Sequence, residues 1–158
     1  EVLRRARKII QSADKELVFT EHYDPSLPHA AGDPDTLMQA VLNLIKNASE
    51  AGTEITLQTK FRSGVSATGE GEEKAQSLPI EIQVIDNGPG IPADLVDQVF
   101  QPFVSTKQDG QGLGLALVSK VAAAHGGVVE VRSHPGHTVF SLLLPVPRLK
   151  TESSDNEI

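Results

Sequence analysis

Hydrophobic and polar residues follow two periods along the chain, and each period predicts one class of element. Apolar residues at the spacing of a helix face predict helices over residues 3–13, 34–51 and 113–125. Asp33 and Pro34 form a typical helix start, since the carboxylate can cap free N–H groups and proline has no N–H to satisfy. Alternating or continuous apolar runs predict strands at 17–20, 55–61, 80–85, 128–132 and 138–144. The last two are expected to pair as a hairpin around Pro135-Gly136.

The polar stretches indicate one domain with two loose segments. Residues 62–78 are rich in Gly, Ser, Glu and Lys and have little to bury, so we expect a mobile loop there. Residues 151–158 are polar and acidic and are expected to form a disordered tail. Residues 1–150 are enough for one domain with its own core. The chain begins at Glu1 within a helical pattern and without Met, so we expect a fragment of a longer protein.

Composition and charge bear on the class of ligand and on location. The formal net charge of −7 disfavours nucleic acid as a partner, because polyanions are bound by clustered Lys and Arg. The chain has no Cys, which excludes a disulfide framework and a thiolate zinc site and suits the cytoplasm. We expect no membrane segment, because no apolar run approaches the roughly 18 residues of a spanning helix and no signal-peptide pattern is present.

The helix expected at 34–51 carries a polar stripe on the side away from its apolar residues. At about 100° per residue, Asn43, Asn47 and Glu50 fall together. Solvated residues on an exposed helix face are one explanation, and a common one. The other explanation is a cation site, because hard cations such as Mg²⁺ take oxygen ligands and keep water and phosphate ligands as well.

Asp86 ends the apolar run of the strand at 80–85 and is followed by Asn87, Gly88, Pro89 and Gly90. A plain turn between two elements would explain these residues. A carboxylate at the end of a buried strand, however, needs a hydrogen-bond donor, because its burial without one is unfavourable. The amino group of adenine is such a donor, and the glycines would let the backbone pass close to the base.

A glycine run precedes and opens the helix at 113–125, with Gly110, Gly112 and Gly114 at alternate positions. A flexible loop before a helix explains it in part. Helix N-termini also present free N–H groups and a positive dipole end, which favour phosphate. The spacing fits neither the P-loop nor the dinucleotide-binding fingerprint. Thr106 and Lys107 lie just upstream and could reach the terminal phosphates of a nucleotide, although a solvated lysine in a loop is the more common case.

These segments resemble, in order and spacing, the N, G1, F and G2 boxes of sensor histidine kinases; they are residues 43–51, 86–91, 100–103 and 110–115. The resemblance covers roughly residues 32–144. It implies the Bergerat ATP-binding fold, an α/β (α+β) two-layer sandwich in which about three helices cover one face of a mixed sheet. It also implies that residues 1–150 are the catalytic and ATP-binding domain and that residues 104–112 close over ATP as a lid. Phe100 and Phe103 are expected to anchor this lid against the core.

The resemblance assigns roles to individual residues. Asn47 would bind Mg²⁺, and Asp86 would accept a hydrogen bond from the adenine amino group. Asn43 would support the metal shell and the phosphates, and Asn43 and Lys107 are the expected catalytic residues. The residues expected to contact ATP are Asn43, Lys46, Asn47, Glu50, Asp86, Gly88, Gly90, Ile91, Thr106, Lys107, Gly110, Gln111, Gly112, Leu113, Gly114, Leu115 and Thr138.

Within the family, residues 23–28, 33–35 and 135–138 are similar to nitrogen-regulation sensor kinases of the NtrB type. None of the 5 His residues fits the phosphoacceptor motif of such kinases, so the acceptor is expected on a separate dimerisation domain. The implied partners are that domain, a response regulator of the NtrC type and a PII-type signalling protein. The fragment is expected to be a monomer, because the dimerising helices would precede Glu1.

The residue at position 43 bears on the reaction. In the hydrolysing relatives this position is a glutamate that activates water, whereas the amide of Asn43 cannot act as a general base. Transfer of the γ-phosphoryl group is therefore favoured over hydrolysis. Two alternatives stay open: an ATPase of the same superfamily, and a non-catalytic regulatory module that binds nucleotide. Glu50 departs from the basic residue that many of these kinases carry at its position.

Overall fold

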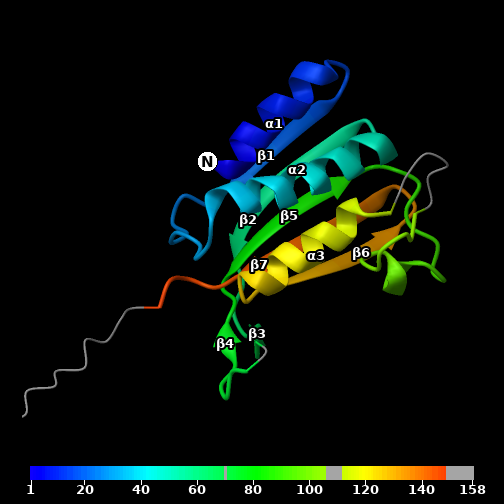
Figure 1. Cartoon of the computed structure of the whole chain (residues 1–158). Coiled ribbons are helices and arrows are strands. Elements are labelled where there is room, and N and C mark those ends of the chain that lie inside the picture. The colour runs from blue at the N-terminus through cyan, green and yellow to red at the C-terminus, as the bar shows by residue number, and fades with distance from the viewer. Residues whose placement is uncertain (70, 106–111, 149–158) are drawn as a thin grey trace, which may run out of the picture.

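Three α-helices and a five-stranded sheet form two layers in the computed structural model, which describes residues 1–69, 71–105 and 112–148 (Figure 1). The helices are α1 (Val2–Ala13), α2 (Pro34–Ala51) and α3 (Gly114–Ala124). The strands of the sheet are β1 (Val18–Tyr23), β2 (Glu54–Phe61), β5 (Ile80–Asp86), β6 (Val128–His134) and β7 (His137–Leu144). A short two-stranded ribbon, β3 (Ser66–Ala67) with β4 (Gln76–Ser77), and a 3₁₀ turn η1 (Val96–Gln98) complete the described elements.

The sheet is mixed, with strand order β1-β2-β5-β7-β6. β1 pairs with β2 in parallel, and the other neighbours are antiparallel. A parallel pair needs a crossover connection, and α2 supplies it between β1 and β2. The register of the antiparallel strands sets Asp86 of β5 opposite Thr138 of β7.

All three helices lie on one face of the sheet, with α2 between α1 and α3 (Figure 1). The apolar side of α2 is buried against the sheet, as its periodicity predicts, and Leu44 and Ile45 have no exposed surface. From the sheet, Leu57, Val84 and Phe140 complete the centre of this core. Burial of these large side chains is the main favourable term that holds the layers together.

Both ends of α2 are fixed by polar contacts. At its start, the Asp33 carboxylate accepts from the Thr36 N–H at 3.0 Å, and this bond holds the pKa of Asp33 below its usual value. The Asp33 N–H donates to Nε2 of His125, just after α3, at 3.0 Å. At the other end, Gly52 follows the last residue, and its N–H donates to the Ala48 carbonyl at 2.9 Å. The helix that carries the polar stripe is thereby held in place along its length.

The predicted fold class, helices and strands are confirmed, with shifts of a few residues at the ends. The first strand begins at Val18 and runs to Tyr23, and the strand predicted at 128–132 continues to His134. The segment 62–78 contains the β3–β4 ribbon, and Arg62 at its start forms an ion pair with Glu130 at 3.0 Å. The predicted tail, residues 151–158, lies outside the described residues.

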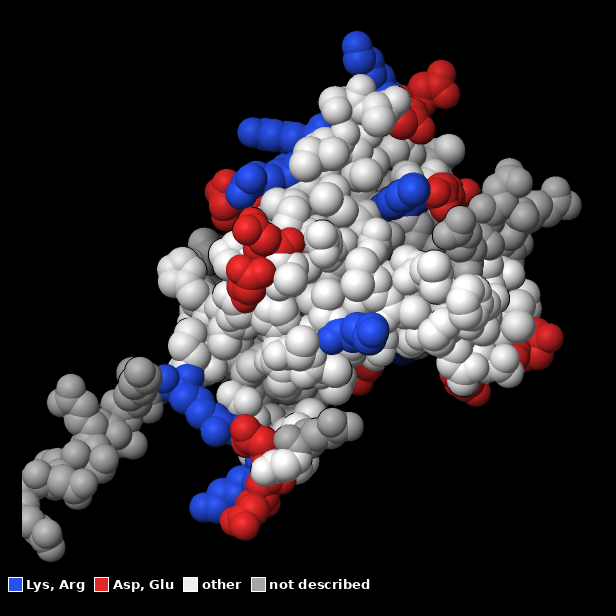
Figure 2. Space-filling model, in the orientation of Figure 1, with Lys and Arg blue, Asp and Glu red and all other residues white. Residues whose placement is uncertain are grey.

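The surface carries mixed charge on the face that Figure 2 presents. Lys and Arg side chains there are interspersed with Asp and Glu instead of forming one continuous basic surface, in keeping with the negative net charge (Figure 2). Within the part of the chain that the structure describes, no helix is both long enough and apolar enough to cross a membrane.

Candidate functional site

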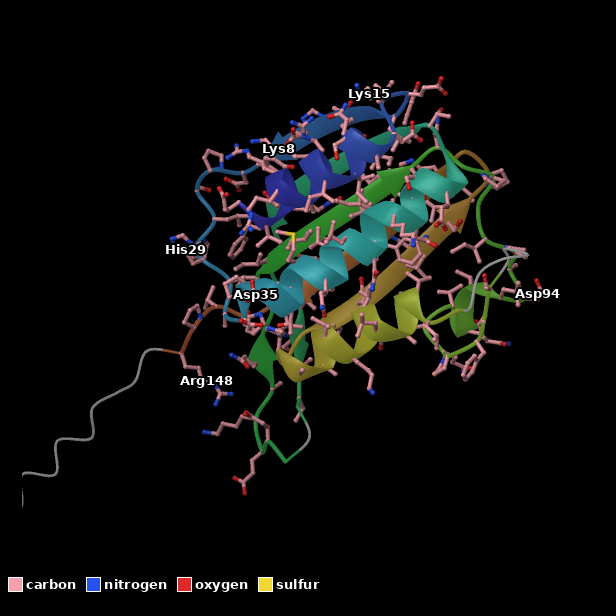
Figure 3. The ribbon with its side chains drawn as sticks, turned by 45° about the horizontal axis from the view of Figure 1, so that its top comes forward. Lys8, Lys15, His29, Asp35, Asp94 and Arg148 are labelled. Atoms are coloured by element: carbon pink, nitrogen blue, oxygen red, sulfur yellow. The ribbon has the colours of Figure 1, made fainter. Side chains whose placement is uncertain are left out.

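A cavity of about 620 Å³ opens between the second half of α2, the end of β5 and the start of α3. Its volume is within the usual range for small-molecule sites. It lies toward the end of the helix layer where Figure 3 shows Asp94, away from Asp35 at the start of α2 (Figure 3). The residues that line it are Asn43, Lys46, Asn47, Glu50, Ala51, Asp86, Pro89, Gly90, Ile91, Leu95, Val99, Val104, Ser105, Gly112, Leu113, Gly114, Leu115, Thr138 and Phe140.

The polar stripe of α2 forms one wall of this cavity. Asn43, Asn47 and Glu50 all line it, as does Lys46 between them, whereas the apolar side of the helix faces the core. Nδ2 of Asn43 donates to the Gly114 carbonyl at 3.4 Å, a long contact that joins α2 to the start of α3. The stripe therefore presents amide and carboxylate groups to whatever occupies the cavity.

The donor set of this wall suits a cation that is shared with a ligand. Among the described residues, no cluster of three or more His, Asp, Glu or Cys is arranged to hold a metal by itself. Mg²⁺ usually takes only one or two protein oxygens and fills its remaining positions with water and phosphate. The amide oxygens of Asn43 and Asn47 with the Glu50 carboxylate fit that mode of binding.

Asp86 lies at the floor of the cavity and is almost fully buried, with 3% of its surface exposed. It is the last residue of β5, and its neighbour in β7, Thr138, is also 3% exposed. Oδ1 of Asp86 accepts from the Gly88 N–H at 2.8 Å. A carboxylate held in this way at the end of a strand presents a fixed acceptor to a ligand amino group.

The loop after β5 is fixed on two sides. On the side of α2, Oδ1 of Asn87 accepts from the N–H groups of Thr53 and Glu54 at 3.0 and 3.1 Å. On the side of the β6–β7 hairpin, the Gly136 N–H donates to the Gly88 carbonyl at 2.8 Å. The loop therefore joins the end of α2 to the tip of the hairpin.

Gly90 is required where this loop meets the hairpin. Its φ of +85° lies in the left-handed region that favours glycine. A Cβ at this position would also lie 2.9 Å from the carbonyl carbon of His134, which is closer than real contacts of that kind. Beside it, the Ile91 N–H donates to Oγ of Ser133 at 2.8 Å.

The glycine run meets the cavity at Gly112, Leu113, Gly114 and Leu115. Gly112 has a φ of +68°, and its carbonyl accepts from the Phe103 N–H at 3.1 Å. A Cβ on Gly112 would lie 2.6 Å from the carbonyl carbon of Phe103, so the two backbone segments lie too close together to admit a side chain at position 112. Four other predicted site residues, Thr106, Lys107, Gly110 and Gln111, lie outside the described residues.

The two phenylalanines of the third motif behave differently. Phe100 packs edge-on against Phe140, with ring centroids 6.0 Å apart, as expected for a residue anchored in the core. Phe103 is 80% exposed, so the prediction that it anchors the neighbouring segment against the core is wrong. Its backbone has a φ of +68°, and it is the backbone N–H, bonded to Gly112, that makes the connection instead of the ring.

Several residues of the site have no signal in the local sequence. Leu95, Val99 and Phe140 line the cavity, but their apolar side chains indicate only a core. Asn87 and Ser133 act through backbone groups of distant segments. Only the pairing of the strands could reveal such contacts.

Comparisons with known proteins agree with this geometry. Residues 32–148 match the model of the family described as histidine kinase-, DNA gyrase B-, and HSP90-like ATPase. The sensory histidine kinase/phosphatase NtrB of Rhizobium leguminosarum bv. phaseoli is 44% identical over 153 residues, covering 93% of this chain and 40% of that protein. NtrB of Azospirillum brasilense is 47% identical over 150 residues, covering 92% and 38%. The chain thus spans about 40% of the length of the curated relatives it matches.

Solved structures give the same answer for the fold. The mycobacterial sensor histidine kinase MprB superposes with a TM-score of 0.75 at 26% identity, over 93% of this chain and 94% of that one. A similarity of this extent covers the two-layer fold.

Proposed function

The chain belongs to the family of histidine kinase-, DNA gyrase B-, and HSP90-like ATPases, and from this premise we propose that it is the ATP-binding catalytic domain of a sensor histidine kinase. Its task is to position Mg-ATP for transfer of the γ-phosphoryl group to a histidine on a dimerisation domain outside the chain. The observation that carries the proposal is one cavity that joins the amides of α2, the buried Asp86 and the start of α3.

Asp86 and its surroundings hold the adenine base. The carboxylate accepts from the amino group at C6 of adenine, while a hydrogen bond from the Gly88 N–H at 2.8 Å keeps it in place. Gly90 and Ile91 line the wall beside it. Because the carboxylate is 3% exposed, a base that offers it no donor binds less well.

The phosphates lie between α2 and the start of α3. Free N–H groups at the start of α3, near Gly114 and Leu115, favour the negative charge there. Asn47 holds Mg²⁺ through its amide oxygen, and Asn43 supports the metal shell and the phosphates. When bound, Mg²⁺ supplies charge neutralisation for the group that is transferred. Thr106, Lys107, Gly110 and Gln111 are proposed to complete the phosphate side, with 104–112 as the lid.

The chemistry that these residues can perform is positioning and electrostatic stabilisation. Phosphoryl transfer needs little more from a protein than in-line placement of the reactants and neutralisation of charge. The amide of Asn43 lies in α2 and contacts the first residue of α3. It can orient groups but cannot deprotonate water. The domain therefore favours transfer to an incoming histidine over hydrolysis.

The similarity to NtrB proteins, at 44% and 47% identity, supports nitrogen regulation as the setting. The partners would then be the protein's own dimerisation domain, a response regulator of the NtrC type and a PII-type signalling protein. An ATP substrate and a chain without Cys fit a cytoplasmic location.

The decisive experiment is transfer of labelled phosphate. The chain is incubated with γ-labelled Mg-ATP and a separately produced dimerisation domain of an NtrB protein, and label on the dimerisation domain is followed with time. We expect label that requires both components. Asn47→Ala should abolish it, because the metal ligand on α2 is lost.

A matched control is Ser49→Ala on the same helix, because the Ser49 hydroxyl is bonded to the Lys46 carbonyl and does not line the cavity. It should transfer label at nearly the normal rate. Steady release of inorganic phosphate without label on the acceptor would favour an ATPase. Binding of ATP without either reaction would favour a regulatory module.

A further inference from the structure

Ser133 joins two parts of the cavity wall, Ile91 and Thr138, through a single hydroxyl group. It lies in β6 next to the hairpin turn, and the strand register pairs it with Thr138. Its Oγ accepts from the Ile91 N–H at 2.8 Å and lies 2.7 Å from Oγ1 of Thr138. Thr138 in turn is paired with Asp86 of β5. Ser133 does not itself line the cavity, but its two partners do, and so does Asp86 beside Thr138.

The bonding of Ser133 determines how the Thr138 hydroxyl can point. A hydroxyl group has one proton and two lone pairs, and one lone pair of Ser133 is taken by the Ile91 N–H. Among the described residues, Thr138 is the other hydrogen-bond partner of this hydroxyl. We therefore infer that the Ser133 hydroxyl donates its proton to Oγ1 of Thr138. Bonds that run in one direction, from Ile91 through Ser133 to Thr138, also strengthen one another.

Once Thr138 accepts from Ser133, its own proton is free to point into the cavity that it lines. The floor then presents a donor, the Thr138 hydroxyl, beside an acceptor, the Asp86 carboxylate. Adenine offers the complementary pair, an amino donor next to a ring-nitrogen acceptor. Guanine offers a carbonyl oxygen where adenine has its amino group, and that oxygen would face the carboxylate.

We propose that Ser133 is a positioning residue that sets the base selectivity of the site by orienting the Thr138 hydroxyl and the Ile91 backbone. This inference rests on the proposed function, since it assumes that a nucleotide base occupies the floor of the cavity. Ser133 contributes to recognition of the base and leaves the phosphate side unaffected. The same contact holds the loop 87–91 against the hairpin. At position 90 the two segments lie so close that there is no space for a side chain.

The test compares three ligands on three variants of the whole chain. ATP, GTP and inorganic tripolyphosphate, each with Mg²⁺, are titrated against the unmodified chain, Ser133→Ala and Ser133→Thr. Ser133→Ala should weaken ATP binding about tenfold, the usual effect of one lost hydrogen bond in a partly buried network. The ratio of ATP to GTP affinity should fall by a similar factor, and tripolyphosphate should bind as before. Ser133→Thr keeps the hydroxyl and should restore most of the ATP affinity.

Ser141→Ala is the matched control. Ser141 is a buried serine of β7, and it accepts from Nε2 of Gln83 at 3.4 Å without lining the cavity. Its loss should lower thermal stability without changing the affinity ratio. The inference is overturned if Ser133→Ala binds ATP like the unmodified chain, or if it loses ATP and tripolyphosphate equally. Failure of the unmodified chain to bind ATP at all would overturn the proposed function as well.

Discussion

The two sides of the cavity are attached to the rest of the fold in different ways. The floor, formed by the end of β5 and the loop after it, is held by hydrogen bonds within the loop, to the backbone after α2 and to the hairpin. The side at the start of α3 is joined by the Phe103–Gly112 backbone bond at 3.1 Å and by the Asn43–Gly114 contact at 3.4 Å. Among the described residues, the floor thus has more fixed contacts than the α3 side.

Under the proposed function, this difference would give the two sides separate tasks. A preorganised acceptor such as Asp86 costs little ordering when a ligand binds, so it selects the base efficiently. The phosphate side must admit the ligand and then present its terminal group to a second protein domain. Fewer fixed contacts suit that task, because elements that move in a catalytic cycle have low local stability.

The largest expected effect comes from removing the acceptor at the floor. Asp86→Asn replaces the carboxylate by an amide, which presents an N–H₂ group where an oxygen accepted from the Gly88 N–H or is proposed to accept from the adenine amino group. ATP affinity should fall by roughly a hundredfold, because a charge-assisted hydrogen bond is lost and a donor is left facing a donor. Isothermal titration with Mg-ATP measures this change. Affinity within threefold of normal would contradict the assignment of Asp86 to the base.

An intermediate effect is expected on the other side, at Gly112. Gly112→Ala adds a Cβ where 2.6 Å separates it from the Phe103 carbonyl carbon, at a φ of +68°. The backbone contact must open, and ATP affinity should fall about tenfold with a smaller change in melting temperature. Gly136→Ala serves as its control, since Gly136 also has a positive φ, of +83°, but no atom lies near its missing Cβ. Equal losses in both variants would mean that backbone strain alone explains the result.

A smaller effect is expected when the floor keeps its acceptor but loses a support. Asn87→Ala removes two hydrogen bonds to the backbone after α2 and leaves Asp86 and its Gly88 contact intact. ATP affinity should fall about threefold to tenfold, and the association rate should fall because less of the free protein has the floor in place. Stopped-flow binding separates the two rates. If Asn87→Ala lowered ATP affinity as much as Asp86→Asn does, the position of Asp86 would depend entirely on the Asn87 hydrogen bonds.

The smallest effect on binding is expected far from both sides, at the start of α2. The pKa of Asp33 is lowered by hydrogen bonds from Thr36, so the charged carboxylate stabilises the fold above the pKa of the unfolded chain, about 3.9. That contribution is lost as the pH falls through the lower pKa of the folded state. Asp33→Ala should therefore lower the melting temperature at pH 7, with the difference disappearing in acid. ATP affinity at neutral pH should stay the same, and a large loss would mean that the whole of α2 shifts.

Local sequence patterns predict α2, the position of Asp86 and the glycine run, because each depends on residues close together in the sequence. The capped start and apolar spacing of α2 fix a long helix, and Asn43 and Asn47 then fall on one side by geometry alone. Asp86 could be predicted because apolar residues at 80, 82, 84 and 85 indicate a buried strand that ends at this carboxylate. The glycines at 112 and 114 were identified from the run itself.

The remainder depends on which distant segments meet. Ser133 approaches Ile91 because β6 lies next to β7 and β7 next to β5, an order that no local pattern contains. The outward position of Phe103 follows from its left-handed backbone, which aromatic residues rarely adopt and which its sequence does not suggest. The β3–β4 ribbon involves only two residues per strand, too few for a period to appear.

The parallel pairing of β1 with β2 has a consequence for how the domain folds. The crossover between these strands is α2 itself, so the helix with the two amides can dock only after segments about 36 residues apart have paired, Val18 with Glu54. Contacts between distant segments form late in folding because closing the loop costs chain entropy first. We therefore expect the cavity to form late in folding. Mg-ATP should slow the unfolding of this domain while leaving its rate of folding unchanged.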